Sequence, residues 1–174
     1  ERAVRDGEVQ LESAVSEPAA AAVRLEQEPG AYGGAAWEKP IAIRGEPVEI
    51  ELAPWSELGI RSYSGLSEYR TTFSLPDGVS DARVLLDLGE VAVSASINVN
   101  GKQVGTAYKR PYRYEIGEAA RPGENTLTVE VANTVANHYA TETPTDYVYE
   151  GQTRSGLTGP VTVSIQPRAS VRVS

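Results

Sequence analysis

Alternation of apolar and polar residues is the feature that most constrains the fold of this chain. Seven runs place an aliphatic or aromatic residue at every second position, and they span residues 48–52, 69–75, 84–88, 95–99, 112–116, 127–131 and 161–165. A period of two puts the apolar side chains of a run on one face of a β-strand, whereas a helix would spread them around its axis. Strands with one apolar and one polar face are typical of antiparallel sheets that are packed on one side and solvated on the other.

Turn residues separate these runs. Asn100-Gly101 favours a two-residue type I′ hairpin turn, because both central residues of that turn need a positive φ. Asp77-Gly78 and residues 122–125 are further turn signals. No segment has a convincing period of 3.6, so we expect helix to account for less than about 10% of the chain. The pattern as a whole predicts an all-β fold, an antiparallel sandwich of two sheets.

The length of 174 residues fits one domain with a long leader. We expect a β-sandwich over residues 45–168, an N-terminal lead-in over 1–44 that contributes strands, and a tail over 169–174. Weaker alternation within the first 25 residues supports strands in the lead-in. The sequence contains no Met, even at position 1, so we expect it to be a processed or excised piece of a longer chain.

Composition excludes several classes of function. The absence of Cys rules out disulfides, thiol catalysis and Cys-ligated metal sites. His138 is the single histidine, which argues against a His-based zinc site and leaves a Ser-His-Asp triad only through that residue. The formal net charge of −8 argues against nucleic acid or an anionic membrane as a partner. No apolar run reaches the roughly 18 residues that a membrane-spanning helix needs.

Short motifs follow one another in an order that resembles a known family. They are PWSELG at 54–59, YSG at 63–65, YRTTF at 69–73, LDLGEV at 86–91, INVNGK at 97–102, PGENTL at 122–127, VANTVAN at 131–137 and SGLTGPV at 155–161. This order is similar to the galactose-binding-like jelly-roll domains of large glycoside hydrolases, such as the sugar-binding domains of family 2 β-glycosidases. It resembles even more the C-terminal sandwich of family 106-type α-L-rhamnosidases. The resemblance covers about residues 45–166, and most of its glycines and aliphatic residues are explained by turns and packing alone.

The resemblance implies a jelly-roll sandwich that is a non-catalytic accessory domain of a multidomain glycoside hydrolase. Such a domain would bind carbohydrate weakly or brace the catalytic domain of the same chain, which in these enzymes carries the acid and the base. It also implies polysaccharide degradation by a bacterium, outside the cell or in the periplasm. Domains of this kind often hold a structural calcium ion, so calcium is the one cofactor raised, although no Asp-x-Asp-x-Asp-Gly loop marks its position.

Two predicted loop regions carry residues suited to sugar binding. Aromatic rings cover the C–H face of a sugar, and planar polar groups make paired hydrogen bonds to adjacent hydroxyls. Loops present such side chains on a sandwich, because the strands themselves build the core. The candidate carbohydrate-binding residues are Tyr108, Arg110, Tyr112, Asn137, His138 and Tyr139.

Each candidate also has a structural interpretation. Tyr112 alternates with Tyr114 and therefore fits the core as well as a site. Arg110 could pair with one of the 24 carboxylates, and Asn137 could hydrogen-bond the backbone of a turn. His138 is not expected to be catalytic, since no Gly-x-Ser-x-Gly elbow supplies a nucleophile for it to activate.

Two other functions remain open on the sequence. One is a purely structural interdomain module without a ligand, and the other is a small stand-alone esterase or lyase, for which the nucleophile motif is missing. Exposure of the candidate residues around a concave surface would favour binding, and their burial would favour the structural module. Of the two tryptophans, Trp55 is expected to pack against the edge of the sandwich, and Trp37 to be exposed or to contact a neighbouring domain.

Overall fold

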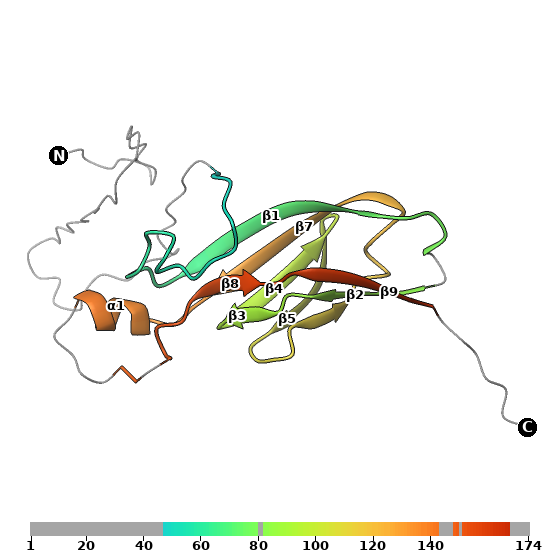
Figure 1. Cartoon of the computed structure of the whole chain (residues 1–174). Coiled ribbons are helices and arrows are strands. Elements are labelled where there is room, and N and C mark those ends of the chain that lie inside the picture. The colour runs from blue at the N-terminus through green and yellow to red at the C-terminus, as the bar shows by residue number, and fades with distance from the viewer. Residues whose placement is uncertain (1–46, 80–81, 143–147, 150, 168–174) are drawn as a thin grey trace, which may run out of the picture. The chain divides into compact units, whose positions relative to one another are not determined.

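The computed structural model describes residues 47–79, 82–142, 148–149 and 151–167 (Figure 1). The chain divides into two units after Glu49, and the second unit, from Ile50 onward, contains nearly all of the described residues. The predicted lead-in over 1–44, with Trp37, and the predicted tail over 169–174 lie outside the described residues. Their boundaries therefore stay predictions.

The regular secondary structure of the described residues is almost entirely strand. They are β1 (Leu66–Leu75), β2 (Ala82–Asp87), β3 (Glu90–Ala92), β4 (Ser94–Val99), β5 (Lys102–Ala107), β6 (Arg113–Glu115), β7 (Gly123–Ala132), β8 (Gly156–Gly159) and β9 (Thr162–Pro167), with one helix, α1 (Ala136–Glu142), between β7 and β8. Strands account for 48% of the described residues and helix for 6%. The predicted all-β class is confirmed.

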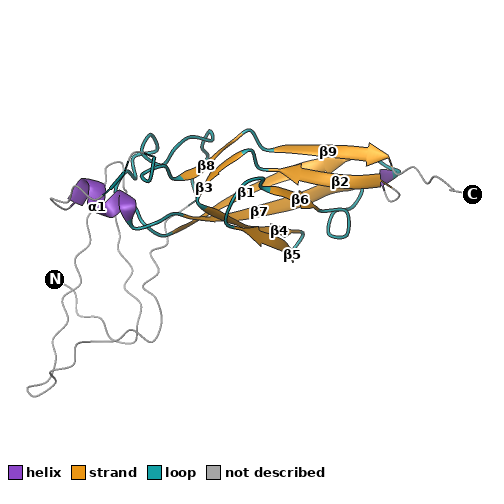
Figure 2. Cartoon of the chain, turned by 90° about the horizontal axis from the view of Figure 1, so that it is seen from below, coloured by secondary structure: helices purple, strands orange, loops and turns teal. Residues whose placement is uncertain are grey.

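The strands form antiparallel sheets in two layers. One layer is a four-stranded sheet of order β1-β7-β4-β5, and the other is a three-stranded sheet of order β6-β2-β9. Figure 2 shows β2 and β9 on one side of the sandwich and β1, β7 and β4 on the other. A short β3-β8 pair completes the fold. This arrangement confirms the predicted antiparallel β-sandwich.

The core lies between the two layers and follows the predicted alternation. On β7, Leu127, Val129 and Val131 are buried, while the intervening positions face outward. On β2, Val84 and Leu86 are almost completely buried in the same core. Because β4 and β7 bury every second side chain, their intervening residues leave the opposite face of the four-stranded sheet polar and solvated.

One predicted strand is absent from the structure, and three elements were not predicted. Residues 48–52 form no strand, and Val48 is 78% exposed. Alternation indicates which side chains share a face, but a strand also needs a neighbour for its backbone hydrogen bonds. β3 and β8 are too short to show a period, and α1, in the region expected to be irregular, has only seven residues.

The Asn100-Gly101 turn joins β4 to β5 as predicted. The φ angles are 52° at Asn100 and 82° at Gly101, as a type I′ turn requires. The Asn100 side chain also ties this turn to the rest of the sandwich. Its Nδ2 donates to the Ala119 carbonyl at 2.9 Å and to Asn125 Oδ1 at 2.8 Å, and its Oδ1 accepts from the Thr126 N–H at 3.0 Å.

Two substitutions at Asn100 separate the effects of this network from those of the backbone. Asn100→Gly keeps the positive φ and removes the side-chain hydrogen bonds, so we expect a loss of about 1–2 kcal/mol in the free energy of unfolding. Asn100→Ala removes the same hydrogen bonds and places at positive φ a residue that tolerates this conformation less well than Asn or Gly, which should add about 1 kcal/mol. Urea unfolding of both variants measures the difference. Equal stability of Asn100→Gly and the parent chain would show that the network contributes nothing.

Asp87 joins the end of β2 to two neighbouring segments. Its Oδ1 accepts from the Gly89 N–H at 2.9 Å, and its Oδ2 accepts from Arg113 Nε of β6 at 2.6 Å. The hydrogen bond from the Gly89 backbone, followed by that from Arg113, holds the pKa of the Asp87 carboxyl below its usual value. A group whose pKa is lower in the folded than in the unfolded chain stabilises the fold above its unfolded pKa, and this contribution disappears as the pH falls through the folded pKa.

Asp87→Asn should therefore destabilise the sandwich at neutral pH, by about 0.5–1 kcal/mol. The difference between this variant and the parent chain should shrink as the pH is lowered from about 5, because the parent carboxyl then takes up a proton. Thermal unfolding at a series of pH values tests this expectation. Asp77→Asn, which changes an exposed turn carboxylate, is the matched control and should show no such convergence.

Candidate functional site

The loop between β5 and β6 presents two of the candidate residues to solvent. Tyr108 is 75% exposed. Arg110, two residues further on, forms an ion pair with Glu90 of β3 while its side chain stays 60% exposed. The ion pair agrees with the alternative that Arg110 pairs with a carboxylate, but it leaves the guanidinium accessible to solvent. A ring and a cation therefore lie together at the surface of this loop.

Tyr112, at the end of the same loop, belongs to the core. It is 4% exposed, and its hydroxyl donates to the Val93 carbonyl at 2.5 Å. Burial raises the pKa of the Tyr112 hydroxyl, and the charge of Arg110 lowers it by a smaller amount. The ring of Tyr112 is thus packed inside the sandwich and does not face a ligand, which favours the core-packing alternative for this residue.

Helix α1 carries the other three candidates, at the end of the sandwich where β1 begins and β7 ends (Figures 1 and 2). Asn133 fixes the approach to the helix. Its Oδ1 accepts from the Gly65 N–H and its Nδ2 donates to the Tyr63 carbonyl, each at 2.8 Å. Thr134 Oγ1 then accepts from the Ala136 N–H at 3.3 Å, at the first residue of the helix. The start of α1 is therefore held against the segment that leads into β1.

Asn137 is the buried residue of the helix. It is 1% exposed, and its Nδ2 donates to Ser155 Oγ at 2.9 Å and to the Arg61 carbonyl at 3.3 Å. Its Oδ1 is buried and has no hydrogen-bond partner among the residues that the structure describes. Asn137 thus connects α1 to two loops, which favours a structural role for its side chain. The loops that it contacts are distant in the sequence, whereas the sequence pattern suggested a local turn.

His138 and Tyr139 lie on the exposed side of α1. The two rings are tilted by 58° with their centroids 5.7 Å apart, and Tyr139 is 45% exposed. The His138 N–H donates to Ser64 Oγ at 3.3 Å. Four of the six candidates are therefore exposed. They belong to two groups. The β5–β6 loop is held by contacts with Glu90 and Val93, and the helix is held by contacts with Ser64, Arg61 and Ser155. A carbohydrate-binding role for these four stays a prediction.

Trp55 packs inside the domain, as predicted. It is 1% exposed, and its Nε1 donates to the Tyr69 hydroxyl at 2.6 Å. That hydroxyl also accepts from the Leu157 N–H at 3.2 Å. A Cβ on Gly156 would lie 2.7 Å from the indole of Trp55, so the residue at position 156 must be glycine for this packing. Trp55 is thus unable to offer a ring face to a sugar.

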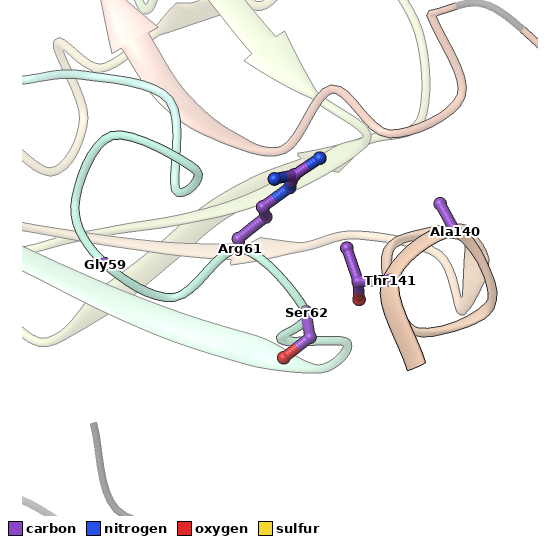
Figure 3. Close-up of a pocket in the computed structure, with 5 residues that line it drawn as sticks. All are labelled: Gly59, Arg61, Ser62, Ala140 and Thr141. Carbon is purple, nitrogen blue, oxygen red and sulfur yellow. The ribbon is translucent and has the colours of Figure 1, made fainter. Parts of the chain in front are cut away.

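A hollow of about 310 Å³ opens between the loop that precedes β1 and the C-terminal turn of α1 (Figure 3). Its lining residues are Gly59, Arg61, Ser62, Ala140 and Thr141. None of them was a candidate from the sequence. Arg61 and Ser62 stand between two motifs of the resemblance, in a segment without periodicity, and only the folded structure brings them beside Thr141.

A second hollow, of about 390 Å³, lies on the polar face of the four-stranded sheet. It is lined by Glu68, Ser96, Ile97, Asn98, Gln103, Thr128 and Glu130. The register of β1 and β7 places Glu68 directly opposite Glu130, and Glu68 also pairs with Arg70 at 2.5 Å. These side chains lie on an open sheet face without an aromatic ring, which suits solvation better than enclosure of a ligand.

Within the ranges that the structure describes, no group of three or more His, Asp and Glu side chains is placed to hold a metal ion. The calcium expectation stays untested, since backbone carbonyls could also serve as ligands. The described part of the chain contains no helix that is long and apolar enough to cross a membrane.

A sandwich with one solvated sheet face and polar groups on its loops is typical of galactose-binding-like accessory domains. Residues 63–163 match the family described as the glycosyl hydrolase 2 galactose-binding domain-like family. The chain belongs to this family. The resemblance read from the ordered motifs is confirmed, and the domain is of the non-catalytic kind that accompanies the catalytic part of such glycosidases.

The similar proteins are much longer than this chain. A protein of Formosa agariphila that bears the name of a beta-glucuronidase is 41% identical over 88 residues, which are 48% of this chain and 8% of that protein. The structure of a beta-glucuronidase from an uncultured Clostridium sp. matches at 25% identity with a TM-score of 0.51, covering 63% of this chain and 20% of that one. A rhamnosidase from Novosphingobium sp. PP1Y matches at 35% identity with a TM-score of 0.49, covering 60% and 11%.

The two tyrosines of the β5–β6 loop should respond in opposite ways to truncation. Tyr112→Ala removes a buried ring and its hydrogen bond, so we expect it to destabilise the domain by about 3–5 kcal/mol. Tyr108→Ala removes an exposed ring and should change the stability by less than about 0.5 kcal/mol. Melting temperatures of the two variants compare them directly. A large loss with Tyr108→Ala would mean that its ring packs on the domain.

Proposed function

We propose that this domain is a bracing part of a larger glycoside hydrolase and does not carry the hydrolytic groups itself. The observation that carries the proposal is the family match together with the small share of each relative that this chain covers, between 8% and 20% of their lengths. In such an enzyme the bond-cleaving residues would belong to the remainder of the chain. The domain would stabilise that remainder and help to shape access to it.

The arrangement of carboxylates supports a non-catalytic role. A glycosidase generally places two carboxyl groups on either side of the scissile bond, in a site that surrounds the sugar. Among the described residues, Glu68 and Glu130 face each other on adjacent strands, but they lie on an open sheet face. Arg70 neutralises one of them. Both residues are exposed to solvent.

The names of the relatives suggest the substrate of the larger enzyme. Two of them are named as beta-glucuronidases and one as a rhamnosidase. We propose, on that basis, that the larger enzyme releases a glucuronic acid or rhamnose residue from a glycoside or polysaccharide. The bracing role does not depend on which of the two sugars is released.

Weak carbohydrate binding is the second candidate function. The exposed Tyr108 ring, on the same loop as the Arg110–Glu90 ion pair, supports it, because aromatic rings and planar charged groups are the two kinds of group that hold a sugar. Three or four such contacts on a loop would give an affinity of about 0.1–1 mM. A glycan array with the 174-residue chain, followed by calorimetry with Tyr108→Ala, tests this role separately from bracing.

The 174-residue chain alone should not hydrolyse p-nitrophenyl β-D-glucuronide or p-nitrophenyl α-L-rhamnoside, whereas the full-length product of its gene should hydrolyse one of them. Deleting residues 50–167 from the full-length protein should lower its melting temperature and its yield of active enzyme, because a bracing contact would be lost. Release of p-nitrophenol measures the activity. Turnover by the short chain would contradict the proposal, and so would unchanged stability and activity after the deletion.

A further inference from the structure

Arg61, Lys109, Arg121 and Arg154 form no ion pair within the described ranges, and of these four Arg61 is the one that borders a hollow. Ion pairs within the described ranges occupy Arg70, Arg83, Lys102, Arg110 and Arg113. The guanidinium of Arg61 has no ion pair and no hydrogen bond in the described part of the chain, and it borders the hollow beside α1. Figure 3 shows its side chain on one wall of the hollow and Thr141 on the helix opposite.

The hollow offers more hydrogen-bond donors than acceptors. The guanidinium of Arg61 carries five N–H groups in a planar fork, and the Ser62 hydroxyl makes no hydrogen bond within the described residues. Thr141 Oγ1 donates to the Asn137 carbonyl at 2.7 Å, so its oxygen keeps acceptor capacity toward the hollow. A fork of donors beside hydroxyls is suited to a sugar that carries a carboxylate or a sulfate ester next to free hydroxyl groups.

The backbone of this hollow is held in place before any ligand arrives. The Asn137 side chain donates to the Arg61 carbonyl, and the Tyr63 N–H donates to the Ile60 carbonyl at 3.1 Å. Gly59, at the rim, has a φ of 82° and no heavy atom within 4 Å of the place where a Cβ would lie, so this side of the hollow stays open. A fixed backbone around one long side chain lowers the ordering cost of binding.

The residues that line the hollow favour a negatively charged ligand over a neutral one. None of the five lining residues is aromatic, so a neutral sugar would find no ring to cover its C–H face. Its hydroxyls would mostly exchange hydrogen bonds with water for equivalent ones with protein. An anionic group would gain charge-assisted hydrogen bonds from a guanidinium that has no partner among the described residues. The hollow has a volume of about 310 Å³ and is open to solvent, so a ligand would be held at the surface.

We infer that the hollow between Arg61 and Thr141 binds the acidic group of a saccharide, a uronic acid carboxylate or a sulfate ester, with Arg61 as the anion-binding residue. This inference rests on the proposed function, because a glycosidase accessory domain is exposed to polysaccharide. The hollow shares no lining residue with the Tyr108–Arg110 loop. It would hold one unit of an acidic polymer beside the domain.

Proton–nitrogen NMR of the 174-residue chain, which observes backbone amides and Arg Nε–H groups, tests the inference. The probes are sodium glucuronate, glucose 6-sulfate, glucose and inorganic sulfate. We expect glucuronate, glucose 6-sulfate or both to shift the signals of Arg61, Ser62 and Thr141 saturably in the millimolar range, and glucose to leave them unchanged. The two acidic sugars distinguish the carboxylate from the sulfate ester as the bound group.

Three variants accompany the titration. Arg61→Gln should weaken binding of the acidic sugar about tenfold or more, since the charge and the fork are both lost. Arg61→Lys should retain part of the affinity, because the charge stays and the fork is lost. Arg121→Gln, which removes the same charge from an exposed arginine elsewhere, is the matched control and should bind as the parent chain does.

Several results would overturn the inference. Equal shifts with glucose and with both acidic sugars would show that charge is not recognised, and equal weakening in Arg61→Gln and Arg121→Gln would show that the site is elsewhere. Binding of inorganic sulfate as strong as that of the acidic sugars would show that the sugar part of the ligand is not recognised. Absence of any saturable shift would refute the inference but leave the bracing function standing, because the deletion in the full-length enzyme tests that function independently.

Discussion

The pairing of β1 with β7 is the interaction on which the rest of the domain depends. The two strands run antiparallel over ten residue pairs, from Leu66 opposite Ala132 to Leu75 opposite Gly123. β7 then pairs on its other side with β4, so one long strand fixes the register of the whole four-stranded sheet. The same pairing brings the segment before β1 next to the segment after β7. The Asn133 contacts, helix α1 and the hollow beside it all arise at that junction.

The sequence predicted the strands well where alternation and packing agree. Residues 84–88 and 127–131 alternate because each strand buries one face, and the structure buries those residues. The Asn100-Gly101 turn was predictable because its φ requirement is local. The run 48–52 shows the limit of this reasoning, since alternation without a neighbouring strand leaves Val48 exposed. Helix α1 is too short for a period and is held by contacts with residues about 70 positions away, which no local pattern reveals.

The candidate site was less predictable, because residue type does not determine exposure. Tyr108 and Tyr112 are the same amino acid four positions apart in one loop, yet one is 75% and the other 4% exposed. Only the sandwich, which supplies the Val93 carbonyl as a partner for the Tyr112 hydroxyl, decides between them. Arg61 was overlooked for the opposite reason. Its segment has no regular structure, and its importance lies in having no ion pair in the described part of the chain while bordering a hollow.

The anchoring of the β5–β6 loop has a consequence for how such a domain can diversify. The buried Tyr112 closes the loop at one end, and the pairing of Ala107 with Ala95 closes it at the other. The residues between these two anchors face solvent and contribute little to the core. Their sequence can therefore drift, or be exchanged in the laboratory, without a loss of foldability. Related enzymes could in this way acquire different contacts at the same position of a common scaffold.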